Sequence, residues 1–235
     1  MPIMPNRVDI NSKRQRSLRI SRVVRNRSKE GARVYYDLDA PGTPAAEATG
    51  DRGVPEKVVL VRWRRRTRPG RTYAGVRLQP AIWRALPVAL GADVARWRRL
   101  TEDEIEQAIT DARDRLSTAG REGKPLRIPA ATAVHALITV LGTAIVKKLV
   151  TRHADPARHA KPGVPDLFLY AMCEDGRIES PRFVEVKKPE ETLYPHQADE
   201  LAFMSALGLD ARVMRLLDAD RLPARRRATT TSHER

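Results

Sequence analysis

The sequence predicts an α/β fold in the C-terminal half of the chain, with a mixed β-sheet flanked by helices, preceded by a strongly basic N-terminal region. Two observations support this prediction. After residue 128, apolar runs and helical patterns follow one another in the order helix, strand, strand, helix, strand. The formal net charge of +15 falls entirely in the first 99 residues, which hold 23 Lys and Arg against 8 Asp and Glu, whereas the remaining residues hold 21 of each.

The basic region predicts contact with a polyanion, because such an asymmetric charge attracts phosphate-rich partners. A basic extension that only confers solubility is the alternative. A Gly-containing linker at residues 117–127 predicts the boundary between two parts. We therefore expect a nucleic-acid-binding region at residues 1–120, a folded domain at 121–220, and a disordered tail at 221–235.

Within the basic region, the three-residue spacing of arginines from Arg16 to Arg25 fits one face of a helix, although a strand is equally compatible. Residues 57–66 and 72–78 flank a Pro69-Gly70 turn and predict a β-hairpin. The helix predicted at residues 79–86 has Pro80 near its start. The helix at residues 101–116 begins with a capping box.

Trp63 and Tyr73 of the predicted hairpin lie among arginines. Their rings either stack on bases while guanidinium groups hold phosphates, or pack against each other in a small sheet. The first alternative makes a group of arginines the candidate nucleic-acid contacts: Arg14, Arg16, Arg19, Arg62, Arg64, Arg65, Arg66, Arg68 and Arg71.

The C-terminal elements are expected as a helix at residues 130–151, strands at 165–171 and 182–187, a helix at 195–207, and a strand at 211–217. Pro195 near the start of the second helix and Gly208 just past its end fit the usual helix boundaries. The uncharged stretch at residues 128–146 almost has the length of a bilayer span. Polar residues interrupt it, so we interpret it as a buried core helix and expect no membrane partner.

Candidate catalytic residues lie on the two predicted strands of this core. Asp166 precedes the first strand, and a turn at residues 174–176 would fold the two strands against each other. Glu185 and Lys187, two residues apart on the second strand, point to the same face. Asp166 then lies within reach of a metal ion bound to Glu185. The alternative is structural, with Asp166 capping a strand and Glu185 and Lys187 forming an exposed ion pair.

Carboxylates are the ligands that Mg²⁺ and Mn²⁺ prefer, so Asp166 and Glu185 are the candidate metal ligands, with the backbone carbonyl of Val186 as a third. Such an ion activates water and neutralises charge on a phosphodiester. Lys187 would orient the attacking water or stabilise the developing charge. Gln197, one helix away, would hydrogen-bond Lys187 or the scissile phosphate. The predicted cofactor is thus Mg²⁺ or Mn²⁺.

At these residues the chain resembles the VRR-NUC branch of the PD-(D/E)XK nuclease superfamily. Gly163-Val-Pro-Asp166-Leu is similar to the family's G-x-P-D-L motif, Phe183-Val-Glu185-Val-Lys187 to its F-x-E-V-K motif, and Gln197 to the glutamine that opens its next helix. The resemblance covers about residues 128–217. It implies a restriction-endonuclease-like αββαβ core, metal-dependent cleavage of branched or flapped DNA in repair or phage DNA processing, and action as a homodimer.

One feature departs from the family pattern, which places a metal-binding glutamate on the first core helix. No acidic residue occurs between Glu122 and Asp155, the stretch that holds the helix predicted at residues 130–151. His135 is the candidate replacement ligand, the alternative being a histidine that belongs to the core. Because this acid is missing, the alternative function is that of a non-catalytic nucleic-acid-binding or scaffold protein. A nuclease toxin or effector is a further alternative with the same chemistry.

The expected compartment is the cytoplasm, of the cell or of a phage host. Cys173 is the single cysteine, which excludes an intramolecular disulfide and is compatible with a reducing environment. Residues 1–28 lack the continuous apolar core of a secretory signal.

Overall fold

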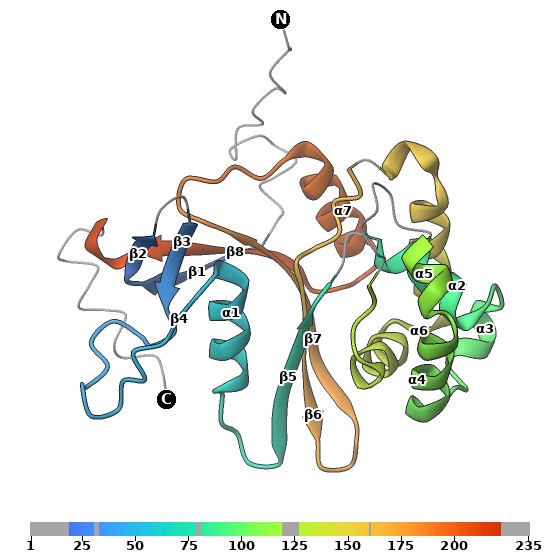
Figure 1. The fold of residues 1–235 in the computed structure, drawn as a ribbon, viewed down its shortest axis with the longest axis horizontal. Coiled ribbons are helices and arrows are strands. Elements are labelled where there is room, and N and C mark those ends of the chain that lie inside the picture. Colours follow the sequence, from blue (N-terminus) through green and yellow to red (C-terminus); the bar gives the residue numbers. More distant parts are fainter. Residues whose placement is uncertain (1–18, 31–32, 79–80, 119–126, 160, 222–235) are drawn as a thin grey trace, which may run out of the picture.

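The computed structural model describes residues 19–30, 33–78, 81–118, 127–159 and 161–221, and the predictions made for the first 18 residues and for the tail from residue 222 lie outside this range. The described part of the chain begins with four strands, and a group of five α-helices, α2 to α6, separates β5 from β6 (Figure 1). In order they are β1 (Arg19–Arg25), β2 (Arg27–Glu30), β3 (Arg33–Asp37), β4 (Arg52–Gly53), α1 (Pro55–Arg64), β5 (Arg71–Arg77), α2 (Ile82–Leu90), α3 (Val94–Trp97), α4 (Glu102–Asp111), α5 (Arg113–Thr118), α6 (Ala131–Ala154), η2 (Pro156–Arg158), β6 (Leu167–Cys173), β7 (Ile178–Lys187), α7 (Pro195–Ala206), β8 (Ala211–Asp218) and η3 (Ala219–Arg221).

The main sheet has five strands in the order β1-β8-β7-β6-β5. β1 and β7 run parallel to β8, whereas β6 pairs antiparallel with both β7 and β5. The predicted mixed sheet is therefore confirmed. It also takes in β1 and β5, so the sheet continues across the boundary predicted at residues 117–127. β2, β3 and β4 form a separate antiparallel sheet.

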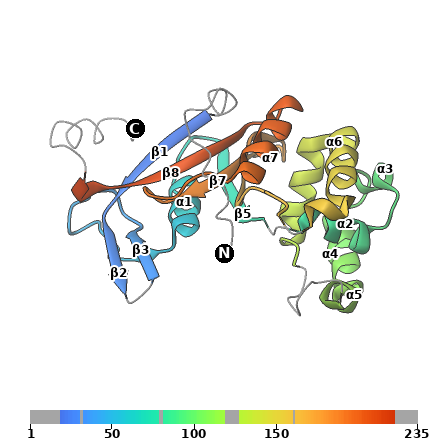
Figure 2. The same ribbon diagram turned by 90° about the horizontal axis from the view of Figure 1, so that it is seen from above.

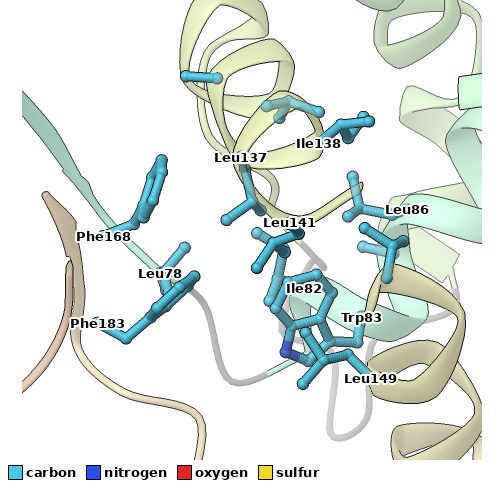
Figure 3. Packing of buried hydrophobic residues seen from close by; sticks show 14 of the residues in the cluster. Leu78, Ile82, Trp83, Leu86, Leu137, Ile138, Leu141, Leu149, Phe168 and Phe183 are labelled. Carbon is cyan, nitrogen blue, oxygen red and sulfur yellow. The ribbon is translucent and has the colours of Figure 1, made fainter. Parts of the chain in front are cut away.

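Helices cover the main sheet on both faces, with α1 on one side and the α2–α6 group on the other (Figure 1). Phe168 and Phe183 point from the sheet toward Leu141 of α6 (Figure 3). On the opposite face, Leu169 and Val184 pack in the cluster that α1 covers. Alternate residues of β6 and β7 thus pack into the two cores, because successive side chains of a strand point to opposite faces of the sheet.

The hairpin predicted for residues 57–66 and 72–78 is wrong, because the first of these segments forms α1. Its β-branched residues suggested a strand, yet Val58, Val59 and Trp63 recur at helical spacing and are buried together against the sheet. Pro55 occupies the first turn, where a missing N–H costs nothing. β5 instead pairs with β6, almost one hundred residues further along the chain.

Most other predicted elements are confirmed. α4 has the predicted capping box between Thr101 and Glu104 and ends at Asp111, with α5 following. β1 is a strand, so the strand alternative for the arginine-rich segment holds over Arg19–Arg25. β7 begins at Ile178, four residues earlier than predicted.

α6 is the helix predicted at residues 130–151, and by length and composition alone it could cross a membrane. Val134, Leu137 and Leu141 are buried in the main core, in agreement with the predicted core helix. At Gly142 the backbone adopts a φ of 67° and a ψ of 162°, which interrupts the helical geometry. α6 is consequently two helical segments joined at a kink.

Candidate active site

The C-terminal end of β7 carries the two central polar residues of the site. Glu185 and Lys187 are only 1% and 6% exposed, and Lys187 Nζ lies 2.7 Å from Glu185 Oε1. Val184 and Val186, the residues before and after Glu185, belong to the core under α1. The predicted shared face is confirmed, but the exposed ion pair considered as the alternative is wrong, because both side chains are buried.

Asp166 lies immediately before β6 and beside these residues. Its Oδ2 accepts a hydrogen bond of 2.8 Å from the Val186 N–H, and its backbone carbonyl accepts one of 2.8 Å from the N–H of Leu78. The β6–β7 register pairs Leu167 with Val184, which brings the start of one strand to the end of the other. The structure thus brings together Asp166, Glu185 and Lys187 as the sequence predicts.

Burial and negative charge dominate the electrostatics of these carboxyl groups. Burial, reinforced by the nearby Asp166 charge and opposed by Lys187, raises the pKa of Glu185 to about 7. Burial also raises the pKa of Asp166, although the Val186 N–H acts in the opposite direction. Glu185 Oε2 is buried and finds no hydrogen-bond partner among the residues that the structure describes. The site therefore holds carboxylate charge that its own lysine does not fully compensate, a condition that favours a bound cation.

Gln197, in the first turn of α7, contacts Glu185. Its Nε2 donates a hydrogen bond of 2.6 Å to Glu185 Oε1, and its Oε1 accepts one of 3.1 Å from the Tyr194 N–H. Gln197 thus contacts Glu185 and not Lys187, and a contact with phosphate stays a prediction. Its hydrogen bond to Oε1 fixes the orientation of the Glu185 carboxylate.

Glu56 is a site residue that sequence reasoning missed. It lies in the first turn of α1, and its charge raises the pKa of Asp166. Its side chain is 31% exposed and pairs with Arg77 at 2.9 Å. α1 precedes β5 in the chain, whereas α6 is the α-helix that precedes β6 and β7, the strands of the site.

α6, the helix predicted at residues 130–151, carries no acid, so the departure from the family pattern stands, and Glu56 is an acid near Asp166 on a different helix. The strand predicted for residues 57–66 gives no reason to place Glu56 at the start of a helix. Pro55 followed by Glu56, ahead of apolar residues at helical spacing, is the signal that could have identified a helix start with an acid in its first turn.

His135 does not lie where either prediction placed it. The side chain is exposed on α6, so it is neither a core residue nor part of the carboxylate group. Within the described ranges, no group of three or more His, Cys, Asp or Glu side chains is arranged to hold a metal ion. The histidine that is buried on α6 is His153, which lies 2.8 Å from the fully buried Glu200 of α7.

The candidate nucleic-acid-binding arginines have different environments. Arg14 and Arg16 lie outside the described residues, and Arg19 begins β1 with only its backbone described. Arg64 donates to the Gly75 carbonyl, and Arg71 pairs with Glu179 at 2.7 Å. The remaining four line a hollow beside the C-terminal end of α1: Arg62, Arg65, Arg66 and Arg68.

Trp63 and Tyr73 do not offer their faces to bases. Their ring centres are 5.1 Å apart in an edge-to-face arrangement, and the rings are 5% and 7% exposed. Trp63 Nε1 also donates a hydrogen bond of 2.9 Å to the Tyr170 carbonyl. The alternative, in which these aromatic residues pack against each other, is correct.

The paired carboxylates of Asp166 and Glu185, with Lys187 two residues further along β7, define a nuclease domain of the PD-(D/E)XK type. They lie at the C-terminal end of β7, the central strand of a mixed sheet flanked by helices. The sequence model of the VRR-NUC domain matches residues 100–216. This part of the chain belongs to the VRR-NUC family.

No curated protein matches the sequence. Among solved structures, paFAN1 bound to DNA with a two-nucleotide 5′ flap and a gap is 17% identical with a TM-score of 0.46, covering 70% of this chain and 35% of that one. paFAN1 bound to DNA with a one-nucleotide 5′ flap and a gap is 14% identical with a TM-score of 0.47, covering 85% and 38%. This chain spans little more than a third of the length of those chains.

Proposed function

We propose that the protein is a divalent-metal-dependent endonuclease that hydrolyses DNA phosphodiester bonds, with a preference for branched or flapped substrates. One observation carries the proposal. Glu185 is buried beside Asp166 and Lys187, with one carboxylate oxygen lacking a hydrogen-bond partner among the described residues. Membership of the VRR-NUC family supports DNA as the substrate, and the family resemblance supports the preference for branched forms.

The residues present fit Mg²⁺ or Mn²⁺. Asp166 and Glu185 supply carboxylate oxygens, and the Val186 carbonyl lies on the same strand. Mg²⁺ commonly binds proteins through one or two carboxylates and completes its shell with water and substrate phosphate. Two adjacent carboxylates of raised pKa are therefore a suitable donor set, and Glu56 adds a third negative charge near Asp166. When bound, the cation lowers the pKa of a water molecule and offsets charge on the phosphate.

The protein's own groups have separate tasks in this reaction. Lys187 keeps its ammonium group next to Glu185 Oε1, from where it orients the attacking water and stabilises the charge that develops on the phosphate. Gln197 holds the same Oε1, so the carboxylate cannot rotate away from Lys187. The Val186 N–H holds Asp166 Oδ2 and leaves its other oxygen for the cation.

The non-catalytic alternative followed from the absence of an acid on the first core helix, and α6 carries none. The buried Glu185 and Lys187 beside Asp166, with Glu56 adding negative charge near Asp166, support cleavage over that alternative. Cleavage is thus the function that the assembled groups favour.

The test is a cleavage assay with purified protein, in Mg²⁺ and in Mn²⁺, on linear, flapped and four-way DNA. Asp166→Asn and Lys187→Met should each reduce cleavage by roughly a hundredfold or more, as expected for groups that stabilise a transition state. Lys188→Met is the matched control, because Lys188 is adjacent to Lys187 but pairs with Glu191 at 2.9 Å. Absence of cutting of every substrate by the unmodified protein, in either metal, would refute the proposal.

A further inference from the structure

The arginines beside the end of α1 belong to a larger feature. A hollow of about 810 Å³ lies on the sheet face that α1 covers, with Leu169 and Met214 in its lining, whereas Glu185 and Lys187 point to the opposite face. The arginines that line it are Arg62, Arg65, Arg66 and Arg68, Arg22 and Arg25 of β1, Arg182 of β7 and Arg212 of β8. Segments far apart in the sequence thus contribute arginines to one concave surface.

The positive charge in this hollow is poorly balanced. Eight arginines line it, against the two lining acids Asp39 and Glu47, and Asp210 pairs with Arg212 and lies 3.4 Å from Arg182. The Asp39 carboxylate already pairs with one arginine, because it lies 2.8 Å from Arg65 Nη1, and it also accepts hydrogen bonds from the N–H and hydroxyl of Thr49. Burial and the positive charges of its neighbours, Arg212 foremost, lower the pKa of Arg182, although Asp210 opposes them. An anionic ligand would relieve this repulsion.

Aromatic rings hold two of the guanidinium groups in place, and one of these, Arg182, also pairs with Asp210 at 3.4 Å. The guanidinium carbons of Arg66 and Arg182 each lie 4.9 Å from the centre of the Trp63 ring, and Arg66 is also 5.3 Å from the centre of the Tyr73 ring. Such cation–π contacts fix a cation yet leave its full charge. Guanidinium groups fixed in this way are suited to phosphate, which they bind through paired N–H donors.

We propose that this hollow binds the backbone phosphates of an unpaired nucleic-acid strand, at a site separate from the catalytic carboxylates. The inference rests on the proposed nuclease function for the identity of the ligand. The volume is that of a small-ligand pocket, which admits a single strand rather than a double helix. Arg65 follows Glu56 by nine residues, which places the hollow about 14 Å along α1 from the acid beside Asp166.

The test measures strand binding with the full-length chain in the absence of divalent metal. Fluorescence anisotropy of a labelled oligothymidylate is recorded at several salt concentrations for the unmodified protein and for Arg66→Gln/Arg68→Gln. The control is Arg96→Gln/Arg99→Gln, which removes the same charge from exposed residues at and just after α3, at the end of the molecule opposite to β1–β3 (Figure 2). Both pairs are exposed, so folding should be preserved.

We expect the Arg66/Arg68 variant to bind roughly tenfold more weakly and to lower the slope of log affinity against log salt by about 1.4, because each phosphate contact to a single strand contributes about 0.7. The control should keep the original slope. Equal slopes and affinities for the two variants would overturn the proposal. Thymidine monophosphate is titrated in parallel, and binding of the monophosphate as tight as that of the oligonucleotide would assign the hollow to a free nucleotide instead of a strand.

The result is independent of cleavage. If the Arg66/Arg68 variant loses strand binding while the unmodified protein cuts no DNA, strand binding by the hollow is supported and the proposed nuclease activity is refuted. If the protein cuts DNA but this variant binds strands as tightly as the control does, the nuclease activity is supported and strand binding by the hollow is refuted.

Discussion

Replacing Glu185 by glutamine should stabilise the metal-free protein above neutral pH. The ionised carboxylate is buried beside Asp166, and burial raises its pKa to about 7 from the ordinary value of 4.5. Glutamine resembles the protonated carboxyl group in shape and charge, and it keeps an oxygen for the Lys187 ammonium and the Gln197 amide, which lie 2.7 Å and 2.6 Å from Glu185 Oε1. The substitution therefore removes the cost of the buried charge and retains the contacts.

The magnitude follows from proton linkage. Between pH 4.5 and about 7 the folded protein binds a proton at Glu185 that the unfolded chain has released, so this residue's contribution to stability falls as the pH rises through that window. At about 1.4 kcal/mol per pKa unit, the full difference is roughly 3 kcal/mol above pH 7. For a chain of this size, that corresponds to a melting temperature higher by roughly 6–12 °C. Below pH 4.5 the two proteins should be equally stable.

Thermal and urea unfolding of both proteins, in chelator, from pH 4.5 to pH 8.5, test this prediction. Glu174→Gln, at an exposed glutamate of the β6–β7 turn, is the control and should show no such pH dependence. Adding Mg²⁺ or Mn²⁺ should stabilise the unmodified protein by about 2.7 kcal/mol at a hundredfold excess over Kd, and should not stabilise Glu185→Gln. A glutamine variant that is less stable at pH 8, or a difference that does not change with pH, would refute the reasoning.

Two further predictions concern the supports of the site. Glu56→Gln should raise the metal concentration needed for half-maximal cleavage. It should change the free energy of unfolding by less than about 1 kcal/mol, because the ion pair of Glu56 with Arg77 is partly exposed. An unchanged metal dependence of cleavage would show that Glu56 is not part of the site. Gly163→Ala should destabilise the fold by more than the roughly 1–2 kcal/mol of left-handed backbone strain, since the new Cβ would lie 2.3 Å from the His196 carbonyl oxygen. Gly176→Ala shares the positive φ but meets open space, so equal losses in urea unfolding would contradict the predicted clash.

Interactions between residues close in sequence were sufficient to predict much of the fold. The capping box at Thr101 marks a helix start through hydrogen bonds that span three residues. The alternation of Glu185 and Lys187 with valines places them on one face through the geometry of a single strand. The turn between β6 and β7 brings Asp166 to Val186, because the two strands are neighbours in sequence.

Long-range packing determined the remainder. Residues 55–64 are rich in β-branched side chains, whose weak strand preference gives way when a helical face can be buried against a sheet. The pairing of β5 with β6 spans almost one hundred residues, and no local pattern specifies it. Glu56 was missed for this reason, since its place beside Asp166 depends on how α1 docks.

The sequence by itself determined the Asp166, Glu185, Lys187 and Gln197 set, because strand alternation, a short turn and the start of the following helix place these residues. Only the tertiary structure decided that Glu56 lies near Asp166 and that arginines from residues 22 to 212 share one hollow. The physical reason is the range of the interactions. Backbone geometry acts over a few residues, whereas the burial of α1 and β1 on the sheet depends on surfaces that form only when the whole chain folds.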